Sequence, residues 1–261
     1  MKTPQHITYF NVQAALGRKY LHPGGQWATE KLLALLPVLD SGSTVLEIGC
    51  GLGATAVMLL DRFPCSYVGL DSSPKMVKKS RRLLRAYESR VRIIECDLFK
   101  EDFPVASGSV EAVIAESVLA ILDPIRITNE CHRVLRRKGV LALNERIWGS
   151  SVGPSERRRL NELAENLYGF PFASEALATA GEWEAAMEEA GFKMARTEKL
   201  ELSQLPESER TVEHPGMPQK LWLALFHPSI FRAQYHDRSI AREYADVWTS
   251  MENWIFVAEK V

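Results

Sequence analysis

The first half of the chain alternates short apolar runs with segments whose apolar residues recur at helical spacing. Runs rich in Val, Ile and Leu are typical of strands buried on both faces of a sheet. Alternation with a repeat of about 25 residues predicts a parallel sheet with right-handed helical crossovers. The predicted strands are 44–48, 67–70, 91–94, 109–115 and 140–147, and the predicted helices between them are 54–60, 74–87 and 124–138, the last ended by Gly139.

Helix boundaries are marked by proline, glycine and capping residues. Ser73-Pro74 and Asp123-Pro124 each place a capping side chain before a proline suited to the first helical turn. Pro23-Gly24-Gly25 predicts a turn before a helix at 27–36, which Pro37 ends. Residues 1–25 otherwise read as irregular.

The rhythm changes after residue 149. The pattern predicts a polar helical stretch over 150–180, a short helix at 182–190 and a strand within 192–202. A helical insertion rich in Trp, Phe and His follows at 203–252, and a last strand at 254–258. We therefore expect one domain over 1–261, with 149–180 and 203–252 as helical insertions.

Three glycines at alternate positions separate the first strand from the first crossover helix. Gly49, Gly51 and Gly53 would let a ligand approach the backbone, and a helix N-terminus with free N–H groups favours an anion. This predicts a nucleotide-like cofactor at the carboxyl edge of the strand. Gly49-x-Gly51-x-x-Ala54, with Asp71 about 20 residues later, also meets a loose dinucleotide fingerprint.

Carboxylates follow three successive strands and argue against a dinucleotide. Glu47, Asp71 and Asp97 would line one crevice with negative charge, which suits a cation better than a diphosphate. A sulfonium cofactor bearing an amino group, ribose hydroxyls and an adenine amine would satisfy these acceptors.

Three stretches, in this order, resemble the motifs of the class I S-adenosylmethionine-dependent methyltransferases. They are Leu46–Gly53, Gly69–Met76 and Cys131–Leu141, and the resemblance covers about 28–148. It implies an α/β, Rossmann-like three-layer sandwich with a seven-stranded, mostly parallel sheet of order 3-2-1-4-5-7-6. The strand at 254–258 would then be the antiparallel seventh.

The resemblance also implies a role for each matching residue. The glycine loop, including Cys50, would approach the methionine end and the ribose, and Glu47 would support the amino group. Asp71 would bind the ribose hydroxyls, and Asp97 the adenine amine. Ser72, Met76 and Leu98 would pack on the adenosine, although Met76 and Leu98 also suit a plain core. Glu116 and Ser117 would lie near the reacting methyl.

Among the six histidines, His22 is the best functional candidate, because it opens the loop before the helix that leads into the first strand. We expect Gly24 and Gly25 to close over the methionine end of the cofactor, the alternative being a simple turn. His22 and Glu116 are thus the candidate catalytic residues. In-line methyl transfer depends mainly on orientation and a dry cavity, and only a hydroxyl acceptor would need a base. No metal-ligand spacing is apparent.

Aromatic residues could cover the site from both ends of the chain. Residues 1–27 would form an N-terminal lid through Tyr9 and Phe10, and the two insertions would cover the acceptor. Aromatic and histidine side chains there could line the acceptor pocket or simply build the core of the cover. They are Tyr168, Phe170, Phe172, Trp222, Phe226, Phe231, Trp248, His214, His227 and His236.

A net charge of −1 without a basic stripe argues against nucleic acid and anionic membranes as partners. The absence of a signal peptide and of an apolar run near ~18 residues predicts a cytoplasmic protein, either monomer or homodimer. The four cysteines fall in predicted core elements as reduced thiols. We expect methyl transfer to a small-molecule S, O, N or C nucleophile, with thiols and sulfide among the candidates and S-adenosylhomocysteine as product. The alternatives are a nicotinamide-dependent oxidoreductase and a non-catalytic cofactor-binding protein.

Overall fold

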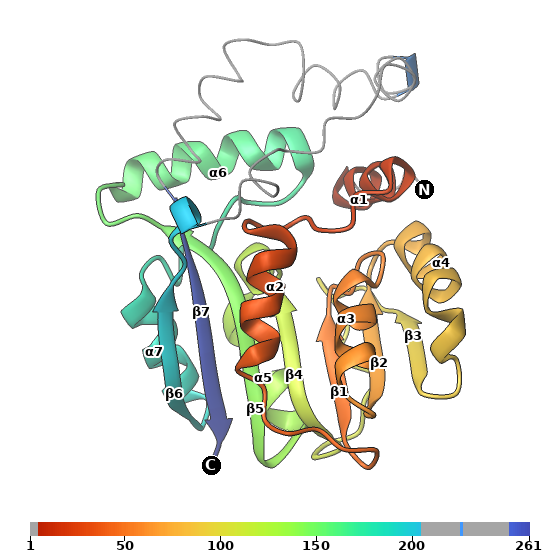
Figure 1. Ribbon diagram of the computed structural model, residues 1–261. Helices are drawn as coiled ribbons and strands as arrows, with labels where there is room; N and C mark the ends of the chain where they lie inside the picture. The colour runs from red at the N-terminus through yellow and green to blue at the C-terminus, as the bar shows by residue number, and fades with distance from the viewer. Residues whose placement is uncertain (1–4, 205–224, 227–250) are drawn as a thin grey trace.

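The computed structural model describes residues 5–204, 225–226 and 251–261. A seven-stranded sheet of order β3-β2-β1-β4-β5-β7-β6 forms its centre (Figure 1). This order confirms the predicted fold. The strands are β1 Thr44–Ile48, β2 Ser66–Asp71, β3 Val91–Glu95, β4 Val110–Glu116, β5 Leu135–Trp148, β6 Phe192–Lys199 and β7 Met251–Lys260.

The first five strands run parallel, so their carboxyl ends share one edge of the sheet. β7 lies antiparallel between β5 and β6, as the resemblance implied. β5 begins at Leu135, five residues earlier than predicted, so the residues just before Gly139 are strand and not the expected end of a helix. At its other end β5 continues beyond β4, because Glu116 pairs with Asn144 and four more residues of β5 follow. The carboxyl end of β5 therefore stands past the edge where β1, β2 and β4 stop.

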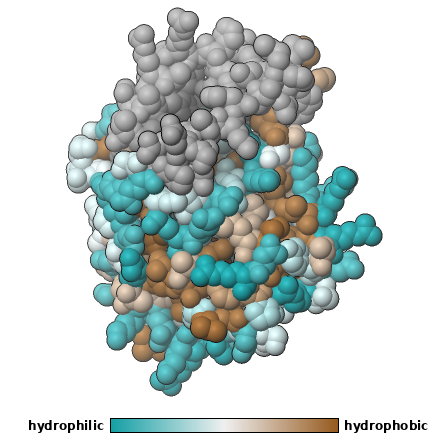
Figure 2. Space-filling view, in the orientation of Figure 1, coloured by the Kyte–Doolittle hydropathy of each residue, from teal (hydrophilic) through white to brown (hydrophobic). Residues whose placement is uncertain are grey.

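Helices cover both faces of the sheet (Figure 1). α2, α3 and α4 pack on one face through an apolar cluster that includes Leu32, Leu59 and Val77. α5 and α7 pack on the other through a cluster that includes Ile127 and Trp183. These helices are α2 Gly25–Ala34, α3 Ala54–Arg62, α4 Pro74–Leu83, α5 Pro124–Val134 and α7 Ala180–Glu189. Figure 2 shows apolar side chains over the middle of the face that carries α2 and α3, among hydrophilic ones.

Two further helices, α1 Gln5–Leu16 and α6 Pro154–Tyr168, lie near the carboxyl edge of the sheet (Figure 1). The expectation that residues 1–25 are irregular is wrong for α1. The buried residues of α1 are Val12, Gln13 and Ala14, which are consecutive and include an amide. They form no stripe at helical spacing, and α1 is stabilised by packing on α4 instead.

Other predicted boundaries shift by a few residues. The helix expected at 74–87 changes to a 3-10 turn at Leu84–Tyr87. Short 3-10 turns also follow β4 at Leu119–Ile121 and β6 at Leu202–Gln204. Most of the predicted insertion at 203–252, with Trp222, Phe231, Trp248, His214, His227 and His236, lies outside the described residues.

The four cysteines are buried and free of disulfides. No helix in the described ranges is long and apolar enough to cross a bilayer. The same residues contain no cluster of three or more side chains that could ligate a metal ion.

Candidate functional site

A cavity opens at the carboxyl edge of the sheet, between the ends of β1, β2 and β4. Its volume is about 790 Å³ including the open space at its mouth. Eight predicted site residues line it: Gly49, Gly51, Asp71, Ser72, Met76, Leu98, Glu116 and Ser117. The structure thus brings together residues from four separate strand ends.

The glycine loop is tightly held from within the protein. Gly49, Gly51 and Gly53 have φ values of 71°, 53° and 84°, which L side chains rarely adopt. A Cβ atom on Gly49 would stand 2.6 Å from Cγ2 of Val118. Close packing and backbone conformation therefore both require glycine at position 49.

Contrary to expectation, several N–H groups of this loop do not face a ligand. Those of Gly49 and Cys50 donate to the Leu70 carbonyl, and that of Gly53 donates to the Cys50 carbonyl. The Gly51 N–H donates to Asp71 Oδ2 at 2.8 Å. A diphosphate would need such groups free, so this loop is poorly suited to a dinucleotide.

Asp71 is fixed at the end of β2 by two backbone donors. Ser73 N–H donates to Oδ1 and Gly51 N–H to Oδ2, each at 2.8 Å. Burial nevertheless raises the pKa of Asp71 to about 6, because the two hydrogen bonds offset only part of the desolvation. The carboxylate lines the cavity and can accept hydrogen bonds from a ligand.

Glu47 and Asp97 do not join Asp71 in the described lining of the cavity. Glu47 is buried beneath the loop, where the Tyr67 hydroxyl donates to it at 2.5 Å. Burial raises the pKa of Glu47 well above its ordinary value, the Tyr67 hydrogen bond lowers it, and nearby Glu116 and Asp71 raise it further. Asp97 pairs with Lys100 at 2.9 Å and accepts from Phe99 N–H at 3.2 Å.

The sequence pattern placed three acids at strand ends, but it could not tell which way each side chain points. Glu47 belongs to β1 and turns under the loop, whereas Asp71 ends β2 and faces the cavity. The buried position of the Glu47 side chain is related to Gly69, which pairs with Glu47 in the sheet. A Cβ there would stand 2.9 Å from both the Tyr67 hydroxyl and Cys50 Sγ, so glycine leaves room for the buried pair.

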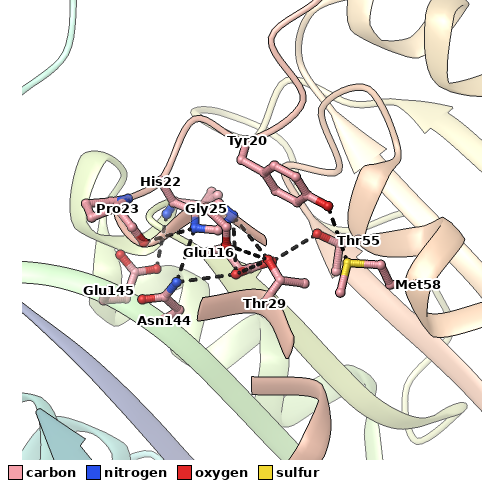
Figure 3. Close-up of polar contacts among 11 residues, drawn as sticks. Tyr20, His22, Pro23, Gly25, Thr29, Thr55, Met58, Glu116, Asn144 and Glu145 are labelled. Atoms are coloured by element: carbon pink, nitrogen blue, oxygen red, sulfur yellow. Dashed lines mark hydrogen bonds and ion pairs between the residues drawn. The ribbon is translucent and has the colours of Figure 1, made fainter. Parts of the chain in front are cut away.

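Glu116 sits at the centre of a polar cluster at the end of β4 (Figure 3). Thr29 Oγ1 lies 3.0 Å from both carboxylate oxygens, and Thr55 Oγ1 donates to Oε1 at 3.0 Å. Asn144 Nδ2 donates to Oε2 at 3.3 Å. These contacts hold one carboxylate orientation at the wall of the cavity.

His22 packs against this cluster. Its Nε2 is 3.4 Å from Glu116 Oε2 and 3.4 Å from Thr29 Oγ1, and its Nδ1 is 3.3 Å from Asn144 Nδ2 (Figure 3). The turn at 22–25 therefore joins the N-terminal segment to the end of β4. Within the described lining of the cavity, however, His22, Gly24, Gly25, Cys50 and Gly53 are not found.

Aromatic residues expected as a cover supply part of the remaining lining. Tyr9 and Phe10 of α1 stand in the cavity wall, and Phe10 stacks on Phe170 with ring centroids 5.3 Å apart. The predicted aromatics Tyr168, Phe170 and Phe172 join Tyr9 in an apolar cluster, so they are partly core and partly lining. The other additional residues are Leu21, Phe99, Val118, Ile121, Leu122 and Arg146. The sequence could have indicated Arg146 as a lining residue, because it places a charged side chain near the end of a buried strand.

Ser117 has an unusual backbone conformation and an unsatisfied side chain. Its φ of 55° is unusual for a residue other than glycine. Its Oγ is buried and has no hydrogen-bond partner, although it belongs to the cavity wall. A ligand group at this position would satisfy the hydroxyl.

Comparison with known proteins agrees with this geometry. A methyltransferase domain model matches residues 45–139. The uncharacterized methyltransferase YodH of Bacillus subtilis is 28% identical over 253 residues, covering 97% of this chain and 99% of YodH. Trans-aconitate 2-methyltransferase of an Azoarcus species is 36% identical over 118 residues, covering 44% of each chain.

Solved structures share the fold at low sequence identity. A geranyl diphosphate methyltransferase in complex with S-adenosylmethionine superposes with a TM-score of 0.66 at 19% identity, covering 90% of this chain and 84% of that one. Phosphoethanolamine N-methyltransferase 2 of Haemonchus contortus, in complex with S-adenosylhomocysteine, gives 0.71 at 17% identity, covering 97% and 58%. The strand order, the glycine loop with Asp71 and these matches together support a class I S-adenosylmethionine-dependent methyltransferase.

Proposed function

We propose that the chain transfers the methyl group of S-adenosylmethionine to a small-molecule acceptor held beside Ser117. The observation that carries this proposal is that one and the same cavity joins Asp71, the glycine loop and Glu116 to an apolar recess. When bound, S-adenosylmethionine supplies a methyl group made electrophilic by its sulfonium. The residues of the chain bind, orient and exclude water, which is most of what this chemistry needs.

The cavity residues fit the cofactor's functional groups. Asp71 accepts from the ribose hydroxyls, and Met76 and Leu98 pack on the adenosine beside Ser72. Asp97 is next to Leu98 in the chain but does not line the described cavity. To bind the adenine amine, its side chain would have to turn toward the cavity. Glu116 offers a negative charge to the amino group, in the place first expected for Glu47. Gly49 and Gly51 provide the bare backbone against which the ribose and methionine parts lie.

We assign His22 a positioning role. It contacts Glu116, Thr29 and Asn144 and is not part of the described lining of the cavity. In that place it orients the carboxylate and does not meet the acceptor. Gly24 and Gly25 shape the turn that brings it there.

Residues 1–27 serve as a lid, and Gln13 of α1 supports this. Both side-chain amide atoms of Gln13 are buried without a hydrogen-bond partner. Gln13 follows Tyr9 and Phe10, which line the cavity, by one helical turn, and it therefore lies on their side of α1 although it is not itself in the described lining. An unsatisfied buried amide is costly, and a polar group of the bound cofactor would remove that cost.

The test is transfer of a labelled methyl group from S-adenosylmethionine to a panel of thiols (sulfide included), amines, phenols and carboxylic acids. We expect acceptor-dependent release of S-adenosylhomocysteine, and at least a tenfold lower rate for Glu116→Gln. Glu88→Gln, an exposed carboxylate elsewhere, is the matched control. Cofactor binding without transfer to any acceptor would favour the non-catalytic alternative.

A further inference from the structure

The part of the cavity farthest along β5 has its own chemistry. We call it the acceptor recess, and its residues are Ser117, Val118, Ile121, Leu122 and Arg146. Two backbone N–H groups fasten the recess to β5: that of Ser117 donates to the Asn144 carbonyl at 2.7 Å, and that of Val118 donates to the Glu145 side chain, at Oε1, at 3.1 Å. The turn after β4 is therefore fastened to the end of β5.

Arg146 brings a positive charge to this recess. It follows Asn144 by two residues in β5, so the two side chains leave the same face of the sheet. Asn144 points to Glu116, and Arg146 stands one step farther out, beyond the end of β4. The adjacent carboxylate of Glu145 leaves the opposite face, where the N–H groups of Val118, Leu119 and Ala120 donate to it.

The carboxylates of the cavity wall are already assigned to the cofactor. Asp71 faces its ribose hydroxyls and Glu116 its amino group, and both are held by donors of the protein. The sulfonium end of the cofactor is cationic as well. Within the described lining of the cavity, Arg146 is the residue with a positively charged side chain, and the fork of donors of its guanidinium suits a carboxylate or a phosphate.

We propose that Arg146 selects an organic anion as the methyl acceptor, with the apolar body of that molecule against Val118, Ile121 and Leu122. Ser117 Oγ, buried and without a partner, lies in the same recess and donates to the anion or to the nucleophile. The recess adjoins the glycine loop, because Val118 contacts Gly49. This inference rests on the proposed function and narrows its substrate class.

Binding of probe molecules to the protein saturated with S-adenosylhomocysteine tests the inference. The probes are phenylacetate, phenyl phosphate and the uncharged phenylacetamide, titrated by calorimetry. We expect at least one anion to bind tenfold or more tightly than phenylacetamide. Which anion binds better separates a carboxylate acceptor from a phosphate ester.

Arg146→Gln should abolish this preference, and Arg146→Lys should keep part of it, since the charge remains but the fork is lost. Arg137→Gln is the matched control, an exposed arginine at the other end of the same strand, and it should behave as wild type. Equal binding of anion and amide, no binding of any probe, or a preference that survives Arg146→Gln would overturn the inference.

Affinity for S-adenosylhomocysteine separates the remaining outcomes. If Arg146→Gln weakens it tenfold or more, the guanidinium binds the carboxylate of the cofactor and the inference is wrong. If the wild-type protein itself does not bind S-adenosylhomocysteine, the proposed function fails first.

Discussion

At the scale of single residues, we expect the protonation state of Asp71 to control how well the cavity accepts a ribose. Its pKa is raised to about 6 by burial, and only the carboxylate form can accept from both hydroxyls. We expect the affinity for S-adenosylmethionine to level off above about pH 6 and to fall by up to about tenfold per pH unit below it. Calorimetric titrations from pH 5 to 8 measure this.

Asp71→Asn should remove that pH dependence and weaken binding by about 1.5–3 kcal/mol, the usual worth of hydrogen bonds to a charged group. Glu88→Gln should leave both the affinity and its pH profile unchanged. A wild-type affinity that is flat between pH 5 and 7 would show that Asp71 is not the ribose acceptor.

Gly49 provides a second test at this scale. Alanine there would meet Val118 Cγ2 at 2.6 Å and hold a φ of 71°. We expect Gly49→Ala to lower the free energy of unfolding by about 2 kcal/mol or more. Adding Val118→Ala should restore the share of the unfolding free energy that was lost to the clash. The share lost to backbone strain should remain lost. Chemical denaturation of the single and double variants measures the coupling, and strict additivity would contradict this packing.

At the scale of elements, α1 shows what the sequence could not predict. Its buried face holds Gln13 between Val12 and Ala14, so hydrophobic periodicity is absent and a loop was expected. The strands and crossover helices were predictable because short apolar runs and Ser-Pro or Asp-Pro caps mark them locally. Side-chain direction was not predictable, which is why Glu47 was expected in the cavity and Glu116 proves to be the second carboxylate of its wall.

Gln13→Met tests the role of this helix. Methionine keeps the volume and the helix propensity but removes an unsatisfied amide, so the free protein should gain about 1–3 kcal/mol of stability. Affinity for the cofactor should fall about tenfold if the amide binds it. Gln26→Met, at an exposed glutamine that donates to Glu30, is the control. Thermal unfolding with and without S-adenosylhomocysteine gives both quantities, and a stability gain without weaker binding would exclude a cofactor contact.

At the scale of the whole molecule, the strand order places the candidate site residues that follow the strands at one edge of the sheet. The parallel strands bring Gly49, Asp71 and Glu116 together, and the longer β5 carries Arg146 past them. Motif spacing was enough to predict this sheet, because three motifs in order admit few topologies. The acceptor side could not be predicted in the same way, since it is assembled from α1, the turn after β4 and the end of β5, which share no sequence signature.

The central claim is that this edge binds an adenosyl sulfonium cofactor and not a dinucleotide. Calorimetric titration of the purified chain with S-adenosylmethionine, and separately with NADH, tests it most directly. We predict one molecule of S-adenosylmethionine bound per chain with a dissociation constant of about micromolar order, and no heat from NADH. Binding of NADH, or failure to bind S-adenosylmethionine, would contradict the account.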